Sequence, residues 1–365
     1  MAEITVSVVM SVFNGERYLR PAVESILGQS FRDFEFIIIN DGSTDGSASI
    51  LDSYQTRDPR VKVFHQENQG LIDSLNRGCG LARGKYIARM DADDISVRDR
   101  LSWQVDFLEN HSEVGLLSGA VEYINAQGRV LCPVHLPTED LEIRSALSRN
   151  ECPIPHPAAV MRRSVLLSIG GYRKPFLHAE DYDLWLRFAQ CSQLANLDKM
   201  VLEYRIHPSQ ITSRKLRQQC LSTLGAREIA SSTHTDAREI LDSGSVITPE
   251  ILARLGVSQA KQQHYMVKRY QDCIKTLVFA GDISGALGLA TDMLCSSRWE
   301  YVEKAVLAEM WLLTASFYRR QGRPLKGLSA VAHALITRPI VAARPLKRLA
   351  RRLGAVIEPE PEGSM

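Results

Sequence analysis

Short, mainly apolar runs in the first quarter of the chain constrain its fold more than any other feature. In chain order these runs cover residues 4–12, 34–39, 61–64 and 85–90. Strands that are apolar on both sides need a sheet covered on both faces, as parallel strands joined by helices provide. Apolar residues at helical spacing over 19–27 and 71–82 supply such helices. The pattern therefore predicts an α/β sheet with right-handed connections.

The pattern changes further along the chain. Residues 114–124 are typical of another strand and residues 181–189 of a helix, whereas three prolines exclude a regular helix over residues 150–160. Beyond about residue 215 strand patterns mostly disappear, and helical spacing covers most of the chain up to residue 335. Gly281 and Gly322 each divide a helix–turn–helix segment, and the two segments weakly resemble each other. They predict helical hairpins similar to tetratricopeptide repeats, or a plain helical bundle.

The chain is therefore expected to have three parts. An α/β domain covers residues 1–215, a helical domain covers residues 216–340, and a basic amphipathic helix with a disordered tail covers residues 341–365. The basic side chains lie between residues 338 and 356, together with leucines at helical spacing. Such a helix either lies on an anionic membrane surface or packs on the helices before it.

Composition and charge exclude several classes of protein. Lys and Arg number 44 against 42 Asp and Glu, and this near-neutral balance argues against a nucleic-acid binder. No apolar run reaches the roughly 20 residues of a membrane-spanning helix, and the first residues lack the features of a secretory signal. The seven cysteines form no Cys-x-x-Cys pair, which indicates reduced thiols and a cytoplasmic location.

Acidic residues end two of the apolar runs. Asp91, Asp93 and Asp94 directly follow the run over 85–90, and Asp41 ends the run before residue 42. Three carboxylates at one strand end repel each other, so they either need a cation such as Mg²⁺ or Mn²⁺ or form an acidic loop that caps the next helix. Because open α/β sheets bind ligands beyond the carboxyl ends of their strands, the acidic ends are expected to share a crevice. Neither a Gly-x-Gly-x-x-Gly nor a Walker-type motif is present.

Six motifs, in this order, closely resemble those of family 2 glycosyltransferases with the GT-A fold. They lie at residues 6–14, 40–45, 90–94, 170–173, 180–187 and 204–207. The resemblance spans roughly residues 4–215, and the helical region beyond it is not covered. It implies a Rossmann-like, mostly parallel sheet with helices on both faces, followed here by an α-helical C-terminal region.

The resemblance also implies a reaction. Such an enzyme is an inverting hexosyltransferase that moves a sugar from a nucleotide-sugar donor, with a UDP-sugar favoured, to an acceptor hydroxyl. It depends on Mn²⁺ or Mg²⁺ and works in bacterial cell-surface polysaccharide or glycolipid synthesis. The acceptor is a saccharide or a lipid-linked saccharide, no nucleic acid is involved, and the enzyme is cytoplasmic or peripheral on the inner face of the membrane.

Roles for individual residues on the donor side follow from the same resemblance. Ser11 and Val12 would edge the nucleobase pocket, and Asp41 would hold the base. Asp91, the first residue of the Asp-x-Asp motif, would contact the ribose or complete the metal site. Asp93 would bind the metal that bridges the diphosphate.

On the acceptor side, the resemblance implies that Asp181 is the general base and that Glu180 is the second candidate for this role. Without the resemblance, a carboxylate at the start of a helix is more often a helix cap. His207 would contact the metal or diphosphate, or make loop hydrogen bonds instead. His156 either shapes the acceptor pocket or is a structural histidine.

Two further side chains and two rival functions complete the expectations. Arg187 is expected to form a structural ion pair that supports the acidic site, and Trp185 is expected to lie in the core rather than to stack on a sugar. The first rival function is a sugar nucleotidyltransferase, which also combines a parallel sheet, a metal and a nucleotide. The second is a non-catalytic interaction protein built around the helical repeats.

Overall fold

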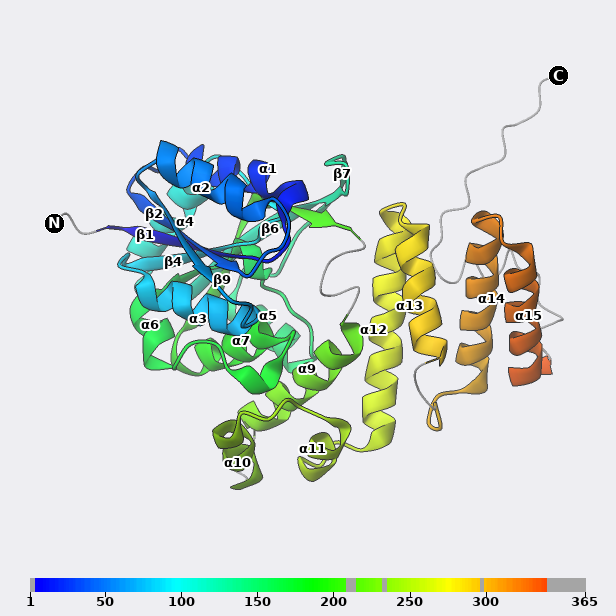
Figure 1. Cartoon of the computed structure of the whole chain (residues 1–365). Helices are drawn as coiled ribbons and strands as arrows, with labels where there is room; N and C mark the ends of the chain where they lie inside the picture. Colours follow the sequence, from blue (N-terminus) through cyan, green and yellow to red (C-terminus); the bar gives the residue numbers. More distant parts are fainter. Residues whose placement is uncertain (1–3, 208–214, 232–234, 296–298, 340–365) are drawn as a thin grey trace, which may run out of the picture. The chain divides into compact units, whose positions relative to one another are not determined.

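The structure, a computed structural model, describes residues 4–207, 215–231, 235–295 and 299–339 (Figure 1). The described residues form two compact units. The first, called the sheet unit, holds the residues up to Arg205 together with Ser222–Ile251, and the second, called the helical unit, holds the rest.

One mixed sheet organises the sheet unit. Its strands follow the spatial order β3, β2, β1, β4, β8, β6, β9 and β5, with β7 beside β6. The strands are β1 (Val6–Val12), β2 (Phe34–Asp41), β3 (Val61–Gln66), β4 (Tyr86–Met90), β5 (Ile95–Ser96), β6 (Val114–Asn125), β7 (Val130–Val134), β8 (Val160–Arg162) and β9 (Gln193–Ile206). Strands β1 to β4 are mutually parallel, which confirms the prediction from the apolar runs. From β4 to β8 onward the observed pairings are antiparallel.

Helices lie between these strands along the chain. They are α1 (Glu16–Leu27), α2 (Ser47–Arg57), α3 (Leu71–Leu81), α4 (Arg100–Asn110), α5 (Asp140–Ser148), α6 (Arg163–Ser168) and α7 (Glu180–Cys191). After β9 the chain continues with α9 (Leu216–Ser231), α10 (Thr235–Ser243) and α11 (Pro249–Arg254). The proline-rich segment holds only a short 3₁₀ turn, η1 (His156–Ala158), as its prolines require. A second 3₁₀ turn, η2 (Lys174–Phe176), precedes α7.

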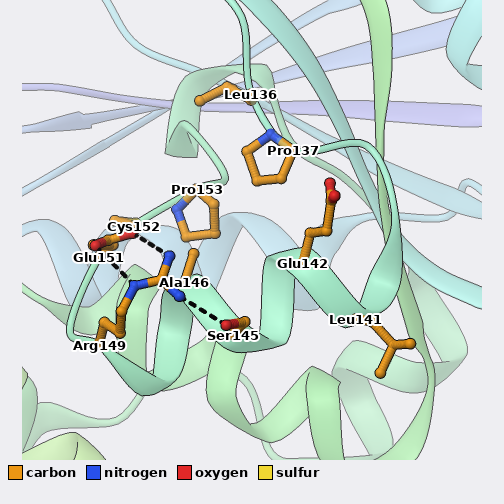
Figure 2. A pocket seen from close by; sticks show the side chains of 10 residues that line it. All are labelled: Leu136, Pro137, Leu141, Glu142, Ser145, Ala146, Arg149, Glu151, Cys152 and Pro153. Carbon is orange, nitrogen blue, oxygen red and sulfur yellow. Dashed lines mark hydrogen bonds and ion pairs between the residues drawn. The ribbon is translucent and has the colours of Figure 1, made fainter.

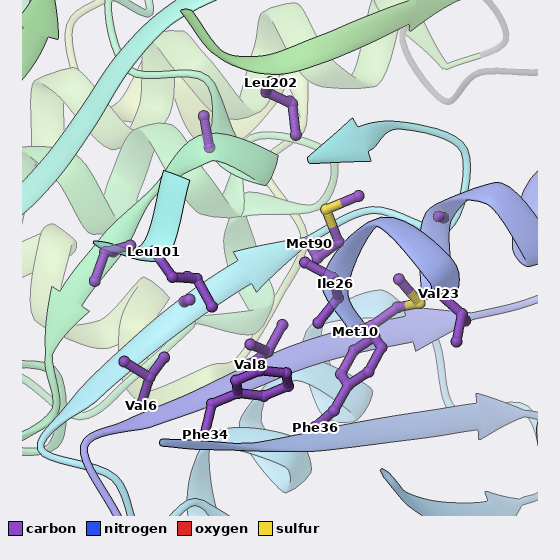
Figure 3. Close-up of a cluster of buried hydrophobic side chains, with 14 of the residues drawn as sticks. Val6, Val8, Met10, Val23, Ile26, Phe34, Phe36, Met90, Leu101 and Leu202 are labelled. Atoms are coloured by element: carbon purple, nitrogen blue, oxygen red, sulfur yellow. The ribbon is translucent and has the colours of Figure 1, made fainter. Parts of the chain in front are cut away.

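The core lies on both faces of β1. On one face Val6, Val8 and Met10 pack with phenylalanines of β2 and with apolar residues of α1 and α4 (Figure 3). On the other face Val9 meets α3, where a Cβ added to Gly78 would lie 2.6 Å from Val9 Cγ1. Only glycine lets α3 approach the strand this closely. Burial on both faces explains why β1 carries apolar residues on both sides of the strand.

The helical unit contains two helix pairs. Their helices are α12 (Gln259–Phe279), α13 (Ile283–Cys295), α14 (Lys304–Arg320) and α15 (Pro324–Thr337). Gly281 and Gly322, with φ of 80° and 70°, form the turn inside each pair, and L-residues with a side chain rarely adopt this backbone conformation. The predicted helical C-terminal region is thus confirmed, whereas the three domain boundaries and the likeness to tetratricopeptide repeats stay predictions.

The predicted basic helix over residues 338–356 falls, from residue 340 on, outside the described residues. Within the part of the chain that the structure describes, no helix combines the length and the apolar character needed to cross a membrane.

The close contact of α3 with β1 predicts different effects for two glycines of the same helix. Gly78→Ala should lower the free energy of unfolding by about 1–3 kcal/mol, because the added methyl group overlaps Val9 in a packed core. Gly80→Ala is the matched control, since no atom lies within 4 Å of its added Cβ and alanine favours a helix by up to about 1 kcal/mol. Urea unfolding should show opposite shifts of the midpoint for the two variants, and equal shifts would contradict this packing.

Candidate functional site

The carboxyl ends of β1, β2 and β4 lie at one edge of the sheet. In the parallel register Met10 is level with Met90, and Val12 is level with Asn40. Ser11 and Val12 at the end of β1 therefore lie between Asp41 on one side and Asp91 on the other. Ser11 is half-buried and Val12 is fully buried. The structure thus brings together the two acidic strand ends that the sequence places in one crevice.

Asp41 is buried and fixes the loop that follows β3. Its Oδ1 accepts hydrogen bonds from Gln66 Nε2 at 2.7 Å and from the Gln69 amide at 2.8 Å, and its Oδ2 accepts one from the Gly70 amide at 2.8 Å. A carboxylate has about four acceptor positions, so these bonds leave room for one more donor. The nucleobase role of Asp41 stays a prediction.

The loops after β1 and β2 hold each other through reciprocal hydrogen bonds. The Asn14 amide donates to Ser43 Oγ at 3.0 Å, and Asn14 Oδ1 accepts from the Thr44 amide at 2.8 Å. Asn14 has a φ of 53°, a left-handed conformation that asparagine tolerates better than most residues. The Glu16 amide also donates to Asp45 Oδ2 at 3.1 Å. These bonds preorganise the sheet edge around Ser11 and Val12.

Three carboxylates gather after β4. One oxygen each of Asp91, Asp93 and Asp94 lies within 4.8 Å of the others. Burial, and then the charges of Asp93 and Asp91, raises the pKa of Asp94 well above its ordinary value. Burial also raises the pKa of Asp91, against the opposing charge of Arg89. Hard oxygen ligands with this much unbalanced negative charge fit a divalent cation such as Mg²⁺ or Mn²⁺.

Arg89 is a buried cation beneath this cluster, and the sequence reasoning assigned it no role. Its guanidinium forms an ion pair with Asp91 Oδ1 at 2.6 Å, donates from Nε to His156 Nε2 at 3.3 Å, and contacts the Met90 carbonyl oxygen. A signal was present, because an arginine inside an apolar run must find a partner once it is buried. The protein thus provides part of the compensating positive charge itself.

Arg205, near the end of β9, holds the cluster from the other side. Its amide donates to Asp94 Oδ1 at 2.7 Å, and its Nε donates to the Asp93 carbonyl oxygen at 2.7 Å. The buried Asp94 is therefore mainly a structural anchor, and Asp91 and Asp93 are more open. His207 is buried and directly follows β9, and its contact with a metal or diphosphate stays a prediction.

Glu180 and Asp181 begin α7. Ala179 is the N-cap residue, and no side chain caps this helix end. Burial and then the charge of Asp181 raise the pKa of Glu180 to about 8. Burial also raises the pKa of Asp181 to about 6, against a hydrogen bond from the Tyr182 amide. Because the pKa of each carboxyl group is raised, the pair keeps a proton more readily than free carboxyl groups do, and such a pair can serve as base and hydrogen-bond donor.

The same helix carries a buried ion pair that fixes the turn before it. Asp183 pairs with Arg187 at 2.8 Å and also with Arg173. Arg187 donates further to the carbonyl oxygens of Ile169 at 2.7 Å and Gly171 at 2.6 Å. The expected structural ion pair of Arg187 is confirmed, and it sets the position at which α7 starts.

Trp185 and His156 are both core residues. Trp185 is fully buried and donates from Nε1 to the Ile154 carbonyl oxygen at 3.2 Å, so the expectation of a core tryptophan is confirmed. His156 lies 2.8 Å from the Tyr172 hydroxyl and accepts from Arg89. Burial, and then the charge of Arg89, lowers the pKa of His156 well below its ordinary value. It is therefore the neutral structural histidine of the two alternatives.

A pocket of about 670 Å³, here called the α5 pocket, lies over α5 (Figure 2). Its lining residues are Leu136, Pro137, Leu141, Glu142, Ser145, Ala146, Arg149, Glu151, Cys152 and Pro153. The acidic cluster does not line it. Cys152 Sγ, however, is 3.9 Å from Asp181 Oδ2, so the pocket adjoins the Glu180–Asp181 pair. The sequence reasoning did not anticipate this pocket.

Comparison with known proteins identifies similar sequences. A model described as "Glycosyl transferase family 2" matches residues 7–170. The O-antigen biosynthesis glycosyltransferase WbnJ of Escherichia coli is 35% identical over 207 residues, which are 55% of this chain and 80% of that protein. An uncharacterised glycosyltransferase of Methanocaldococcus jannaschii is 34% identical over 206 residues, which are 55% of this chain and 70% of that protein.

A solved structure shares the fold. It is a mannosyltransferase from Pyrobaculum calidifontis in complex with GDP-Man and Mn²⁺, with a TM-score of 0.51 and 16% identity. The alignment covers 90% of this chain and 86% of that one. At this identity the likeness supports the expected fold class and says nothing further of the site.

The raised pKa of Glu180 predicts a pH-dependent effect on stability. Its value of about 8 exceeds the ordinary 4.5, so between these pH values the folded protein keeps a proton that the unfolded chain releases. Glu180 therefore lowers stability progressively as pH rises through this window. Glu180→Gln should increase the free energy of unfolding at pH 8, on the order of a few kcal/mol, and should change it little at pH 4.

Thermal unfolding in EDTA across this pH range measures the effect. Glu109→Gln is the control, because the hydrogen bond from Lys85 lowers the pKa of this exposed carboxylate. Loss of that bond should lower the free energy of unfolding by less than about 1 kcal/mol. A Glu180→Gln gain that is independent of pH would show that the pKa of Glu180 is the same in the folded and the unfolded protein.

Proposed function

The chain belongs to glycosyltransferase family 2, and on that premise we propose that it transfers a sugar from a nucleoside-diphosphate sugar to an acceptor hydroxyl with inversion. One observation carries the proposal. The acidic cluster at Asp91 and the carboxyl pair at Glu180 and Asp181 are separate, and the buried Arg89 acts on both. It pairs with Asp91 Oδ1 at 2.6 Å, and its charge partly opposes the rise in the pKa of Glu180 and Asp181 that burial causes. A site for the donor diphosphate thus adjoins a site for the acceptor proton.

The donor would bind across the carboxyl ends of β1, β2 and β4. Ser11, Val12 and Asp41 would contact the base, with a UDP-sugar favoured, and Asp91 would contact the ribose or complete the metal site. Asp91 and Asp93, with His207 as a further candidate, would hold Mn²⁺ or Mg²⁺. When bound, such a cation stabilises the negative charge that develops on the leaving diphosphate. The mannosyltransferase of similar fold is in complex with GDP-Man and Mn²⁺, a donor and a cation of the classes proposed here.

Asp181 would accept the proton of the acceptor hydroxyl. As the acceptor oxygen forms its bond to the anomeric carbon, the bond from that carbon to the diphosphate breaks, and the nucleoside diphosphate leaves with the bonding electrons. A single displacement of this kind inverts the anomeric centre. Glu180, when it carries the proton of the pair, would donate a hydrogen bond beside Asp181. Burial places the pKa of Asp181 at about 6, which suits a base that works at neutral pH.

The biological setting is proposed from the same comparisons. A relative in O-antigen biosynthesis supports a role in bacterial polysaccharide synthesis, with a saccharide or lipid-linked saccharide as acceptor. The enzyme would act in the cytoplasm or on the inner face of the membrane, with residues 338–356 as the contact. A sugar nucleotidyltransferase or a non-catalytic repeat protein is disfavoured, because the family match over residues 7–170 covers the acidic motifs at residues 40–45 and 90–94.

The first experiment identifies the donor and tests the metal. Purified protein is incubated with a panel of UDP-, GDP- and dTDP-sugars, and the released nucleoside diphosphate is measured with and without acceptor. One nucleotide sugar should be consumed, EDTA should abolish turnover, and Mn²⁺ or Mg²⁺ should restore it. Asp93→Asn should raise the metal concentration needed for half-maximal turnover at least tenfold. Asp106→Asn, an exposed change on α4, is the control, and full turnover in chelator would refute the metal site.

The second experiment tests the base. Asp181→Asn keeps the shape of the side chain but accepts no proton, so kcat should fall by roughly 10² to 10⁴ while donor affinity changes little. In the unchanged enzyme log(kcat/KM) should rise with pH and level off above about pH 6, because Asp181 must be ionised. If Glu180→Gln lowered kcat more than Asp181→Asn, the base would be Glu180.

A further inference from the structure

The α5 pocket adjoins the acceptor side of the site and has no role in the donor chemistry. We propose that it binds neutral sugar units of the acceptor that lie beyond the unit under attack, so that the acceptor is an oligosaccharide. The proposal rests on the proposed function, because it takes Asp181 as the base.

The position of the pocket is the first argument. A base must come within hydrogen-bond distance of the acceptor hydroxyl, so the attacked sugar lies against Asp181. Cys152 lines the pocket, and its Sγ is 3.9 Å from Asp181 Oδ2. A sugar next to Asp181 therefore has its neighbouring units within reach of the pocket. The volume of about 670 Å³ falls within the usual range of small-molecule sites and exceeds the space that one sugar ring needs.

The walls of the pocket are fixed to the helix that carries the base. The Tyr182 hydroxyl donates to the Leu147 carbonyl oxygen at the end of α5 at 2.6 Å. Asn196 Nδ2 donates to the carbonyl oxygens of Pro137 at 2.7 Å and Pro153 at 3.1 Å, and both prolines line the pocket. Asn196 itself is buried. Fixed walls favour binding, because little conformational entropy is lost when a ligand enters.

The chemistry of the lining favours a neutral sugar. Glu142 and Glu151 supply two carboxylates against one guanidinium, that of Arg149. Arg149 is paired with Glu151 at 2.9 Å and donates to Ser145 Oγ at 2.7 Å (Figure 2). The net negative lining disfavours a phosphate or a uronic acid. Carboxylates, a guanidinium and a hydroxyl can all bond to sugar hydroxyls.

The remaining surface is aliphatic. Leu136, Leu141 and Pro153 line the pocket beside the polar groups. Apolar side chains can cover the C–H faces of sugar rings, while a few convergent polar groups fix their orientation, as in other small-molecule sites. The lining thus matches the mixed surface of a neutral oligosaccharide.

Blocking the pocket tests the proposal. Ser145 is exposed on the pocket side of α5, so Ser145→Trp should fill the pocket without disturbing the core. Ser148→Trp is the matched control, since Ser148 is exposed on the same helix but does not line the pocket. Each full-length protein is saturated with UDP and applied to an array of neutral, uronic and phosphorylated oligosaccharides. The unchanged protein and Ser148→Trp should bind neutral oligosaccharides, and Ser145→Trp should lose at least tenfold in affinity.

Two further readouts complete the test. The affinity for the nucleoside diphosphate should be equal in the unchanged protein and in Ser148→Trp, and the absence of UDP, GDP and dTDP binding in both would refute the proposed function rather than the pocket. N-ethylmaleimide modification of Cys152, followed by peptide mapping, should be slowed by the best neutral oligosaccharide on the array and less by UDP alone. Three outcomes would overturn the proposal: the protein binds only charged glycans, it binds no neutral oligosaccharide, or Ser145→Trp still binds neutral oligosaccharides.

Discussion

A buried guanidinium joins the two chemical halves of this site. Arg89 lies in β4, the strand at which the sheet changes from parallel to antiparallel pairing. On one side it pairs with Asp91 in the acidic cluster, and on the other it contacts His156 beneath α7. A fully buried charge is tolerated only when counter-charges and hydrogen bonds surround it. The carboxylates at both ends of the site therefore balance Arg89 as much as they serve chemistry.

A second buried polar layer holds this arrangement in place. Arg100 of α4 donates to the Arg89 carbonyl oxygen at 2.9 Å, and Gln104, one turn later, donates to the Ala158 carbonyl oxygen at 2.9 Å. These bonds tie the end of β4 to the proline-rich segment where regular pairing stops. Side chains of a neighbouring helix thus donate hydrogen bonds to carbonyl oxygens of the irregular backbone beside the site, as buried peptide groups require.

Sequence reasoning succeeded where the determinants were local. Apolar runs predicted β1, β2 and β4, and acidic strand ends predicted the shared sheet edge, because parallel strands align their carboxyl ends. It did not identify α4, since Arg100 and Gln104 occupy core-facing positions and interrupt the apolar stripe. The pairing of Arg89 with Asp91 and the approach of Cys152 to Asp181 depend on tertiary structure. The α5 pocket is formed by a short helix and two loops, for which no periodic pattern exists.

The walls of the α5 pocket are held through main-chain carbonyl oxygens, those of Leu147, Pro137 and Pro153. Every residue type supplies a main-chain carbonyl oxygen, so these bonds do not depend on which side chain stands at the accepting position. Glu142, Ser145 and Arg149 can therefore be exchanged during divergence while the pair at the start of α7 stays in place. In the proposed function, the residues that would select the glycan differ from those that would carry out the reaction. Substitutions in the pocket would therefore let duplicated genes acquire new glycan preferences without first losing turnover.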